Sequence, residues 1–211
     1  MKITSKAGTL RDVESRTSLF KVPPLLYFKV DDFRQKSLGV LEEIQEKFNG
    51  CVIVIRSSAA DEDGKSYTMA GKYDSVLNVS SADSVEIELA IKTVIASYEK
   101  DGQFDKNDMV IAQEMVLNTS MSGVIFTHDL NTGAPYYVIN YDDVSGLTDT
   151  VTSGESEYSN RTLYVHRGAL PSLHSARFKK LLLAVQELER ILDSEFLDIE
   201  FSLGEDLTPY L

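Results

Sequence analysis

The sequence is poor in the residue types that support covalent and zinc-dependent chemistry. It has one cysteine, no tryptophan and three histidines among 211 residues. The single Cys51 excludes an internal disulfide framework and a cysteine-based metal site. The histidines His128, His166 and His174 show neither metal-ligand spacing nor a nucleophile context, so we interpret them as structural or surface residues. No GxGxxG, zinc-protease motif or Ser-His-Asp constellation is present.

Long apolar runs and basic clusters are also lacking. No stretch approaches about 18 apolar residues, and the first residues hold no signal-peptide run, so we expect a cytoplasmic protein without a membrane partner. The 21 basic and 33 acidic residues give a net charge of −12. Such a surface repels a phosphate backbone and argues against nucleic acid as a partner. Carboxylates can nevertheless hold the Mg²⁺ that accompanies a nucleotide.

Apolar periodicity switches between helical and strand spacing along the chain. Helical spacing covers 33–48, 80–100 and 174–194. Strand patterns cover 51–55, 109–117, 123–127, 136–141, 162–166 and 196–201. The run 51–55 is apolar on both faces, which predicts a buried strand and a buried Cys51 thiol. We therefore expect an α/β or α+β fold with two lobes, 1–110 and 111–211.

Two polar groups sit at positions where a strand can present them to a ligand. Arg56 follows the buried run and can hold phosphate oxygens through two hydrogen bonds, whereas pairing with the nearby acids is the alternative. Asp198 and Glu200 alternate with apolar residues, so their carboxylates share one strand face about 7 Å apart. Such a pair suits Mg²⁺, and the alternative is a half-exposed strand with a charged outer face.

Two further segments carry weaker signals. Gly71 lets the backbone approach a ligand closely and Ser75 adds a hydroxyl, although a simple turn is the alternative. Gln113 and Glu114 are adjacent in an apolar strand, so they point to opposite faces and one of them can face a pocket. The backbone beside Met115 is then expected to bond an adenine edge, unless this is an edge strand with one wet face.

Five sequence blocks occur in a fixed order at plausible spacing. They are Ile-Arg-Ser-Ser-Ala-Ala-Asp-Glu-Asp at 55–63, Ala-Gly-Lys-Tyr-Asp-Ser-Val-Leu-Asn-Val at 70–79, Gln-Glu-Met-Val with Ser-Gly-Val-Ile-Phe-Thr and Thr-Gly across 113–133, a Gly-Leu block at 146–154, and Asp-Ile-Glu-Phe at 198–201. Together they resemble the ATP-binding domain of the phosphoenolpyruvate synthase and pyruvate phosphate dikinase family. That domain also occurs in rifampicin phosphotransferases and in glucan or water dikinases.

The resemblance implies an ATP-grasp fold, whose two lobes close on Mg-ATP. Carried over position by position, the implied contacts are Lys6, Arg56, Gly71 and Ser75 for the phosphates, Gln113 and Met115 for adenine and ribose, and Glu200 with Asp198 for Mg²⁺. Arg56 is then the catalytic candidate. The implied partners are the nucleotide and the downstream phosphohistidine and pyruvate-binding domains of a full-length protein.

Several positions depart from the family pattern. Thr148 and Asp149 replace glycine and glutamate in the fourth block, and Leu130 replaces a proline. The chain also stops before the expected Gln-x-Arg strand, so we expect either a fragment or a reduced relative of a phosphoenolpyruvate synthase-like, ATP-dependent phosphotransferase. Two alternatives stay open. One is the ATP domain of an antibiotic or polysaccharide phosphotransferase, and the other is a degenerate, non-catalytic nucleotide-binding module.

Overall fold

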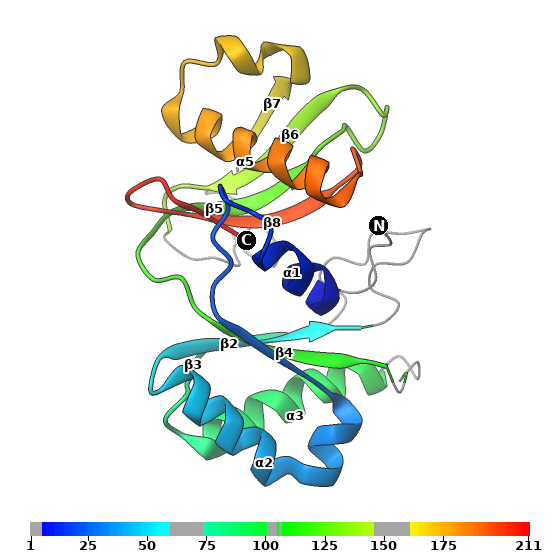
Figure 1. Cartoon of the computed structure of the whole chain (residues 1–211), viewed down its shortest axis with the longest axis vertical. Helices are drawn as coiled ribbons and strands as arrows, with labels where there is room; N and C mark the ends of the chain where they lie inside the picture. The colour runs from blue at the N-terminus through cyan, green and yellow to red at the C-terminus, as the bar shows by residue number, and fades with distance from the viewer. Residues whose placement is uncertain (1–5, 60–73, 101–104, 106, 146–160) are drawn as a thin grey trace. The chain divides into compact units, whose positions relative to one another are not determined.

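The chain forms two compact units, each built on its own antiparallel sheet (Figure 1). The computed structural model describes residues 6–59, 74–100, 105, 107–145 and 161–211. The N-terminal unit comprises residues 6–11 and Pro23–Met115, and the C-terminal unit comprises Asp12–Val22 and Val116–Leu211. Helices pack on both sheets, so the predicted mixed α/β class is confirmed. Within the part of the chain that the structure describes, none of the helices combines the length and the apolar character that crossing a bilayer requires.

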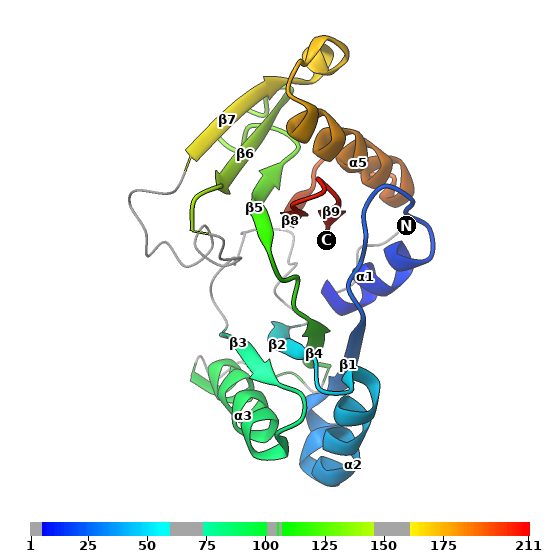
Figure 2. The ribbon, with the colours of Figure 1, turned by 90° about the vertical axis from the view of Figure 1, so that its left-hand side faces the viewer.

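The N-terminal unit is a four-stranded sheet with two helices on one face (Figures 1 and 2). Its strands, in spatial order, are β1 (Leu25–Lys29), β4 (Met109–Glu114), β2 (Val52–Ser58) and β3 (Ser75–Ser80). Helices α2 (Val30–Phe48) and α3 (Ser84–Lys100) cover one face because each carries an apolar stripe. Their shared core includes the fully buried Ile44, Ile53 and Ile91.

Alternate residues of each strand project from the sheet face that the helices do not cover, here called the second face. On β2, Ile55 is buried under the helices, so Arg56 and Ser58 project from the second face. Helix α1 (Lys6–Glu14) begins against this face, where the Ala7 amide donates to Ser58 Oγ at 3.1 Å. The second face therefore carries Arg56, one of the candidates for phosphate binding.

The C-terminal unit is a five-stranded sheet with one long helix on one face (Figures 1 and 2). Its strands, in spatial order, are β7 (Arg161–His166), β6 (Tyr136–Asp142), β5 (Thr119–Phe126), β8 (Asp198–Gly204) and β9 (Pro209–Tyr210). The short 3-10 helix η1 (Arg167–Ser172) precedes α5 (Ala176–Leu192). Helix α5 buries Leu181 and Val185 in a core that includes Ile139 and Ile199 of the sheet.

The early segment Asp12–Val22 belongs to the C-terminal unit. The Lys21 amide donates to the Pro209 carbonyl at 2.8 Å, and the Leu211 amide donates to the Lys21 carbonyl at 3.1 Å. The sequence predicts lobes of 1–110 and 111–211, whereas the contacts divide the chain after Met115 and assign this segment to the second unit. The sequence does not predict this assignment, because hydrogen bonds between Lys21 and residues about 190 positions later produce no local periodicity in the sequence.

Two local predictions are wrong. Cys51 is exposed and lies outside β2, because it follows the turn at Asn49 and Gly50, whose φ angles are 43° and 84°. Strand β2 does not stop before Arg56 but continues to Ser58, because strands β3 and β4 pair with it on both sides.

Candidate functional site

Arg56 and Gln113 come together on the second face of the N-terminal sheet. Arg56 pairs with Ile111 on β4, so Gln113, two residues further along β4, lies diagonally beside it on the same face. The two side chains meet, with Arg56 Nη1 at 3.5 Å from Gln113 Oε1, which is a long hydrogen bond. Two candidates that are distant in the sequence therefore share one polar patch.

Ser75 lies directly across from Arg56. It begins β3 and is the cross-strand partner of Arg56, and such partners project from the same face with Cβ atoms about 5 Å apart. Ser75 is exposed and Arg56 is half-buried. A hydroxyl beside a guanidinium is a donor pair suited to phosphate oxygens. Gly71, the other member of the predicted phosphate loop, lies outside the described residues, as do Thr148 and Asp149.

Lys6 lies near the same end of β2. It is the first residue of α1 and is half-buried, and the neighbouring Ala7 amide is bonded to Ser58, two residues beyond Arg56. Arg56, Ser75 and the backbone of Lys6 therefore lie near one another, where β2 ends and β3 begins. We call these three residues, Lys6, Arg56 and Ser75, the strand-end group.

Gln113 carries an unsatisfied buried donor. The side chain is only 4% exposed. Its Oε1 accepts from Arg56, but its Nε2 has no hydrogen-bond partner among the described residues. Leaving such a donor unpaired costs about 1–3 kcal/mol. An acceptor atom supplied by a ligand or a water would remove that cost.

The backbone at Met115 differs from the expectation. Its amide donates to the Val52 carbonyl at 3.0 Å, and the preceding Glu114 amide donates to the Pro24 carbonyl at 2.9 Å. The Met115 N–H is therefore already used and is not available to an adenine edge. These bonds extend the pairing beyond the end of β4, which the apolar pattern does not reveal. The Met115 side chain lies against β3, with its Sδ 3.1 Å from the Asn78 amide, so the carbonyl is its remaining polar group.

Asp198 and Glu200 lie on the face of β8 that points away from α5. Ile199 and Phe201 are buried in the α5 core, whereas Asp198 is exposed and Glu200 is half-buried, so the predicted alternation is confirmed. No group of three His, Cys, Asp or Glu residues forms a ready metal site in the described ranges. Two carboxylates nevertheless match the number that Mg²⁺ commonly takes from a protein when phosphate oxygens and waters complete its shell.

Asn140 shares a face with Glu200 and is not among the predicted residues. Glu200 pairs with Val124 and Val124 pairs with Asn140, so the three lie in one row across β8, β5 and β6. Asn140 is half-buried, and its Oδ1 accepts from Thr162 Oγ1 at 2.8 Å. Amide and carboxylate oxygens are both hard ligands. The strand pattern at 136–141 contains the signal, since Asn140 falls on the face opposite the buried odd-numbered residues.

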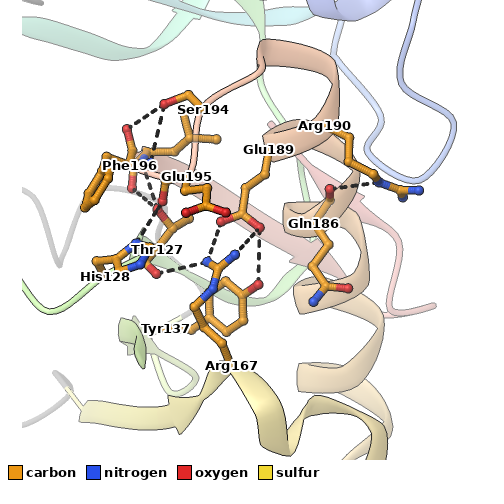
Figure 3. A network of polar contacts seen from close by, with 11 residues as sticks. Thr127, His128, Tyr137, Arg167, Gln186, Glu189, Arg190, Ser194, Glu195 and Phe196 are labelled. Atoms are coloured by element: carbon orange, nitrogen blue, oxygen red, sulfur yellow. Dashed lines mark hydrogen bonds and ion pairs between the residues drawn. The ribbon is translucent and has the colours of Figure 1, made fainter. Parts of the chain in front are cut away.

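A buried polar network lies on the α5 side of the same sheet (Figure 3). Arg167 binds Glu189 through Nη1–Oε1 at 2.5 Å and Nη2–Oε2 at 3.1 Å, and the Tyr137 hydroxyl donates to Glu189 Oε2 at 3.2 Å. Burial raises the pKa of Tyr137, and the hydrogen bond to Glu189 raises the pKa of Arg167. Because Arg167 Nη1 also donates to the Thr127 carbonyl, the network ties η1 and α5 to β5 and β6. We assign it a structural role.

Comparisons with known proteins identify the family and the fold type. Residues 30–176, more than half of the chain, match the family model described as "Pyruvate phosphate dikinase, AMP/ATP-binding domain". The prodigiosin synthesizing transferase PigC of Serratia marcescens is 28% identical over 125 residues, which cover 56% of this chain and 14% of PigC. The chain therefore spans only a small part of that relative.

Solved structures of two ligases resemble the whole fold. The VanG D-Ala:D-Ser ligase from Enterococcus faecalis has a TM-score of 0.51 at 14% identity, and the match covers 98% of this chain and 50% of the ligase. The D-alanyl-alanine synthetase A from Vibrio cholerae has a TM-score of 0.50 at 17% identity, with 97% and 51% covered. At these identities the likeness shows the fold alone, which is of the ATP-grasp type.

The family match includes the strands that carry Arg56, Ser75, Gln113 and Asn140, while Lys6 and β8 lie outside it. Arg56, Ser75 and Gln113, which share the second face, are thus part of the segment that the family model recognises. The chain belongs to the family of the pyruvate phosphate dikinase AMP/ATP-binding domain.

Proposed function

We propose that this chain binds Mg-ATP as the nucleotide-binding part of an ATP-dependent, dikinase-type phosphotransferase. The observation that carries the proposal is the patch formed by Arg56, Ser75 and Gln113 on the second face, in a chain of an AMP/ATP-binding family. The buried Gln113 Nε2, unpartnered among the described residues, supports a ligand at this patch.

The residues divide between the two ends of the nucleotide. In this proposal the strand-end group contacts the phosphates, together with Gly71 from the segment outside the described residues. A guanidinium, an ammonium and a hydroxyl supply charge-assisted donors for phosphate oxygens. Gln113 and the Met115 carbonyl contact adenine and ribose, because an amide side chain and a backbone oxygen can read donors and acceptors on a base edge.

Oxygen ligands for Mg²⁺ come from the C-terminal unit in this proposal. Asp198 and Glu200 share a strand face, and the Asn140 amide oxygen lies in the same row as Glu200. This donor set fits a hard cation such as Mg²⁺. When bound, Mg²⁺ would neutralise part of the charge on the phosphates.

The phosphoryl group passes to a histidine outside this chain. An imidazole nitrogen forms a P–N bond as the P–O bond to the leaving nucleotide breaks, so the chain contributes positioning and charge stabilisation rather than a nucleophile. Arg56 is the proposed catalytic residue because its guanidinium would touch the reacting phosphates. Loss of a preorganised donor of this kind commonly slows such reactions by about 100-fold or more.

The match to PigC favours a second candidate. That relative is named for the synthesis of prodigiosin, not of phosphoenolpyruvate. The same nucleotide chemistry can therefore serve another final acceptor, including an antibiotic or a polysaccharide. Product analysis of the complete protein with candidate acceptors separates these possibilities, whereas the nucleotide test below applies to all of them.

Calorimetric titration of the chain with Mg-ATP tests the phosphate contact. We expect Arg56→Ala to weaken binding by roughly tenfold or more, since a hydrogen bond to a charged group contributes about 1.5–3 kcal/mol. The matched control is Arg34→Ala, which removes an exposed arginine of α2 that pairs with Glu99. If both variants weaken Mg-ATP binding equally, the loss of affinity reflects the change in net charge rather than a contact made by Arg56. No binding by the parent chain would favour a degenerate module.

The metal contact is tested separately with Glu200→Gln. This variant should bind ATP less tightly than the parent in Mg²⁺ and like the parent in excess chelator, because it loses only a metal ligand. Glu46→Gln, an exposed carboxylate on α2, is the control of the same chemistry. A Glu200→Gln defect that persists without Mg²⁺ would contradict the metal role.

A further inference from the structure

Two adjacent residues of α3 hold the two strand ends that carry the phosphate candidates. The Tyr98 hydroxyl accepts from the Ser58 amide at 2.9 Å and donates to the Met109 carbonyl at 2.6 Å. Ser97 Oγ accepts from the Asp74 amide at 3.2 Å. Ser97 is 5% exposed and Tyr98 is 1% exposed, so water competes little for these bonds.

These anchor points lie next to the paired candidates. Ser58 ends β2 two residues after Arg56, and Asp74 immediately precedes Ser75 at the start of β3. Arg56 and Ser75 are cross-strand partners, so movement of either anchor changes the spacing of a guanidinium and a hydroxyl. The ends of strands are where backbone pairing frays most readily.

Ser58 also links the anchors to α1. Its amide is bound by Tyr98, and its Oγ accepts from the Ala7 amide beside Lys6. The buried Tyr98 hydroxyl therefore fixes Ser58, which lies two residues from Arg56 and is bonded to the residue after Lys6. The side chain that delivers it belongs to a helix fixed by the unit's core, since Ile91 and Val94 are fully buried.

We propose that Ser97 and Tyr98 are positioning residues for the binding of nucleotide phosphates. They act indirectly, by holding the backbone amides of Asp74 and Ser58. The inference rests on the proposed function of the second face. Their role is to keep the strand-end group at a fixed spacing, because donors preorganised at the right distance bind phosphate better than donors that must be ordered on binding. Neither side chain has to touch the nucleotide.

Tyr98→Phe tests this role because it keeps the ring in the core and removes only the hydroxyl. We expect Mg-ATP affinity to fall about fivefold, as for the loss of one net hydrogen bond, while adenosine affinity changes less than about twofold. Ser97→Ala should likewise lower the ratio of Mg-ATP affinity to adenosine affinity. Amide exchange at Ser58 should accelerate in Tyr98→Phe while the α5 amides stay unchanged.

The matched control is Tyr137→Phe. It also removes a buried tyrosine hydroxyl, here bound to Glu189, but in the C-terminal unit. It should lower the melting temperature and leave the ratio of ATP to adenosine affinity as in the parent. If Tyr98→Phe does not fold, the same ratio measured for Ser97→Ala decides the outcome.

The possible results separate the two proposals. A parent chain that binds neither ligand overturns the proposed function and this inference together. A parent that binds both, with an unchanged ratio in Tyr98→Phe and Ser97→Ala, overturns only the positioning role. Equal losses for ATP and adenosine also overturn it, because they indicate general destabilisation.

Discussion

At the scale of single residues, Gln113 has a buried unsatisfied donor that costs stability and is a proposed contact for the nucleotide. Its buried Nε2 lacks a partner among the described residues, and its Oε1 accepts the long hydrogen bond from Arg56. Natural cores rarely keep an unsatisfied buried donor unless it has a function. Folding and binding should therefore respond oppositely to its replacement.

Gln113→Met removes the donor while keeping a side chain of similar length. We expect the free energy of unfolding without ligand to stay equal or to rise, since the penalty of about 1–3 kcal/mol for the orphaned donor disappears. Mg-ATP affinity should fall in the same variant. Urea denaturation and calorimetry measure the two effects. Gln45→Met on α2, which loses a bond to the Ala82 carbonyl, should leave affinity unchanged, and a Gln113→Met variant that binds normally would contradict the assignment.

The sequence supplies candidate site residues but not how they come together in the fold. Arg56 and Ser75 are named by the family resemblance, but their pairing across β2 and β3 depends on strand register, which no local pattern encodes. Asn140 is missed because a lone amide in a strand is usually a surface residue. The backbone beside Met115 is predicted to be free for an adenine edge, whereas the bond from the Met115 amide to the Val52 carbonyl depends on tertiary pairing.

At the scale of elements, one carboxylate of α5 holds the early segment of the C-terminal unit. Glu187 accepts from the Thr17 hydroxyl at 2.8 Å, from the Ser18 hydroxyl at 2.6 Å and from the Leu19 amide at 2.9 Å. Partial burial acts to raise the pKa of Glu187, but the hydrogen bonds from these three residues outweigh it and lower the pKa to about 2. The charged form is therefore the one that holds the segment.

This pKa shift makes part of the stability depend on pH. A carboxyl group with a folded pKa of about 2 and an unfolded value of 4.5 stabilises the fold fully above pH 4.5, and the contribution disappears as the pH falls toward 2. Glu187→Gln should therefore be less stable than the parent at pH 7, and the two should converge near pH 2. Urea denaturation across this range measures the difference. Glu205→Gln, an exposed control, should show no such convergence, and a constant gap for Glu187→Gln would contradict the account.

Long amphipathic helices are the elements that the sequence predicts best. The spacing over 80–100 corresponds to α3, which begins only at Ser84 because Asp83 Oδ1 accepts from the Val85 and Glu86 amides at 2.9 and 3.2 Å. The predicted end of α2 at residue 48 is confirmed, and the left-handed Asn49 follows it. By contrast, β1 and β3 have no predicted counterpart, because short strands gain their stability from neighbours and carry little periodicity of their own.

At the scale of the whole molecule, the described residues form two hydrophobic cores that share no residue. Ile44 is fully buried in the first core and Leu181 is fully buried in the second. Ile44→Ala and Leu181→Ala should each lower the stability of their own unit by about 2–5 kcal/mol through lost burial and a residual cavity. Amide exchange resolved by residue measures each unit separately.

Mg-ATP should raise the stability of each destabilised unit if residues from both units contact it. A ligand present at about 100 times its dissociation constant adds about 2.7 kcal/mol to any unfolding that releases it. In the proposed function Arg56 of the N-terminal unit and Glu200 of the C-terminal unit both contact the ligand, so unfolding of either unit would remove a proposed contact. We therefore expect Mg-ATP to slow amide exchange in both Ile44→Ala and Leu181→Ala, and Glu200→Gln to abolish the rescue of Leu181→Ala. Rescue of Ile44→Ala alone would mean that the N-terminal unit binds the nucleotide without Asp198 and Glu200.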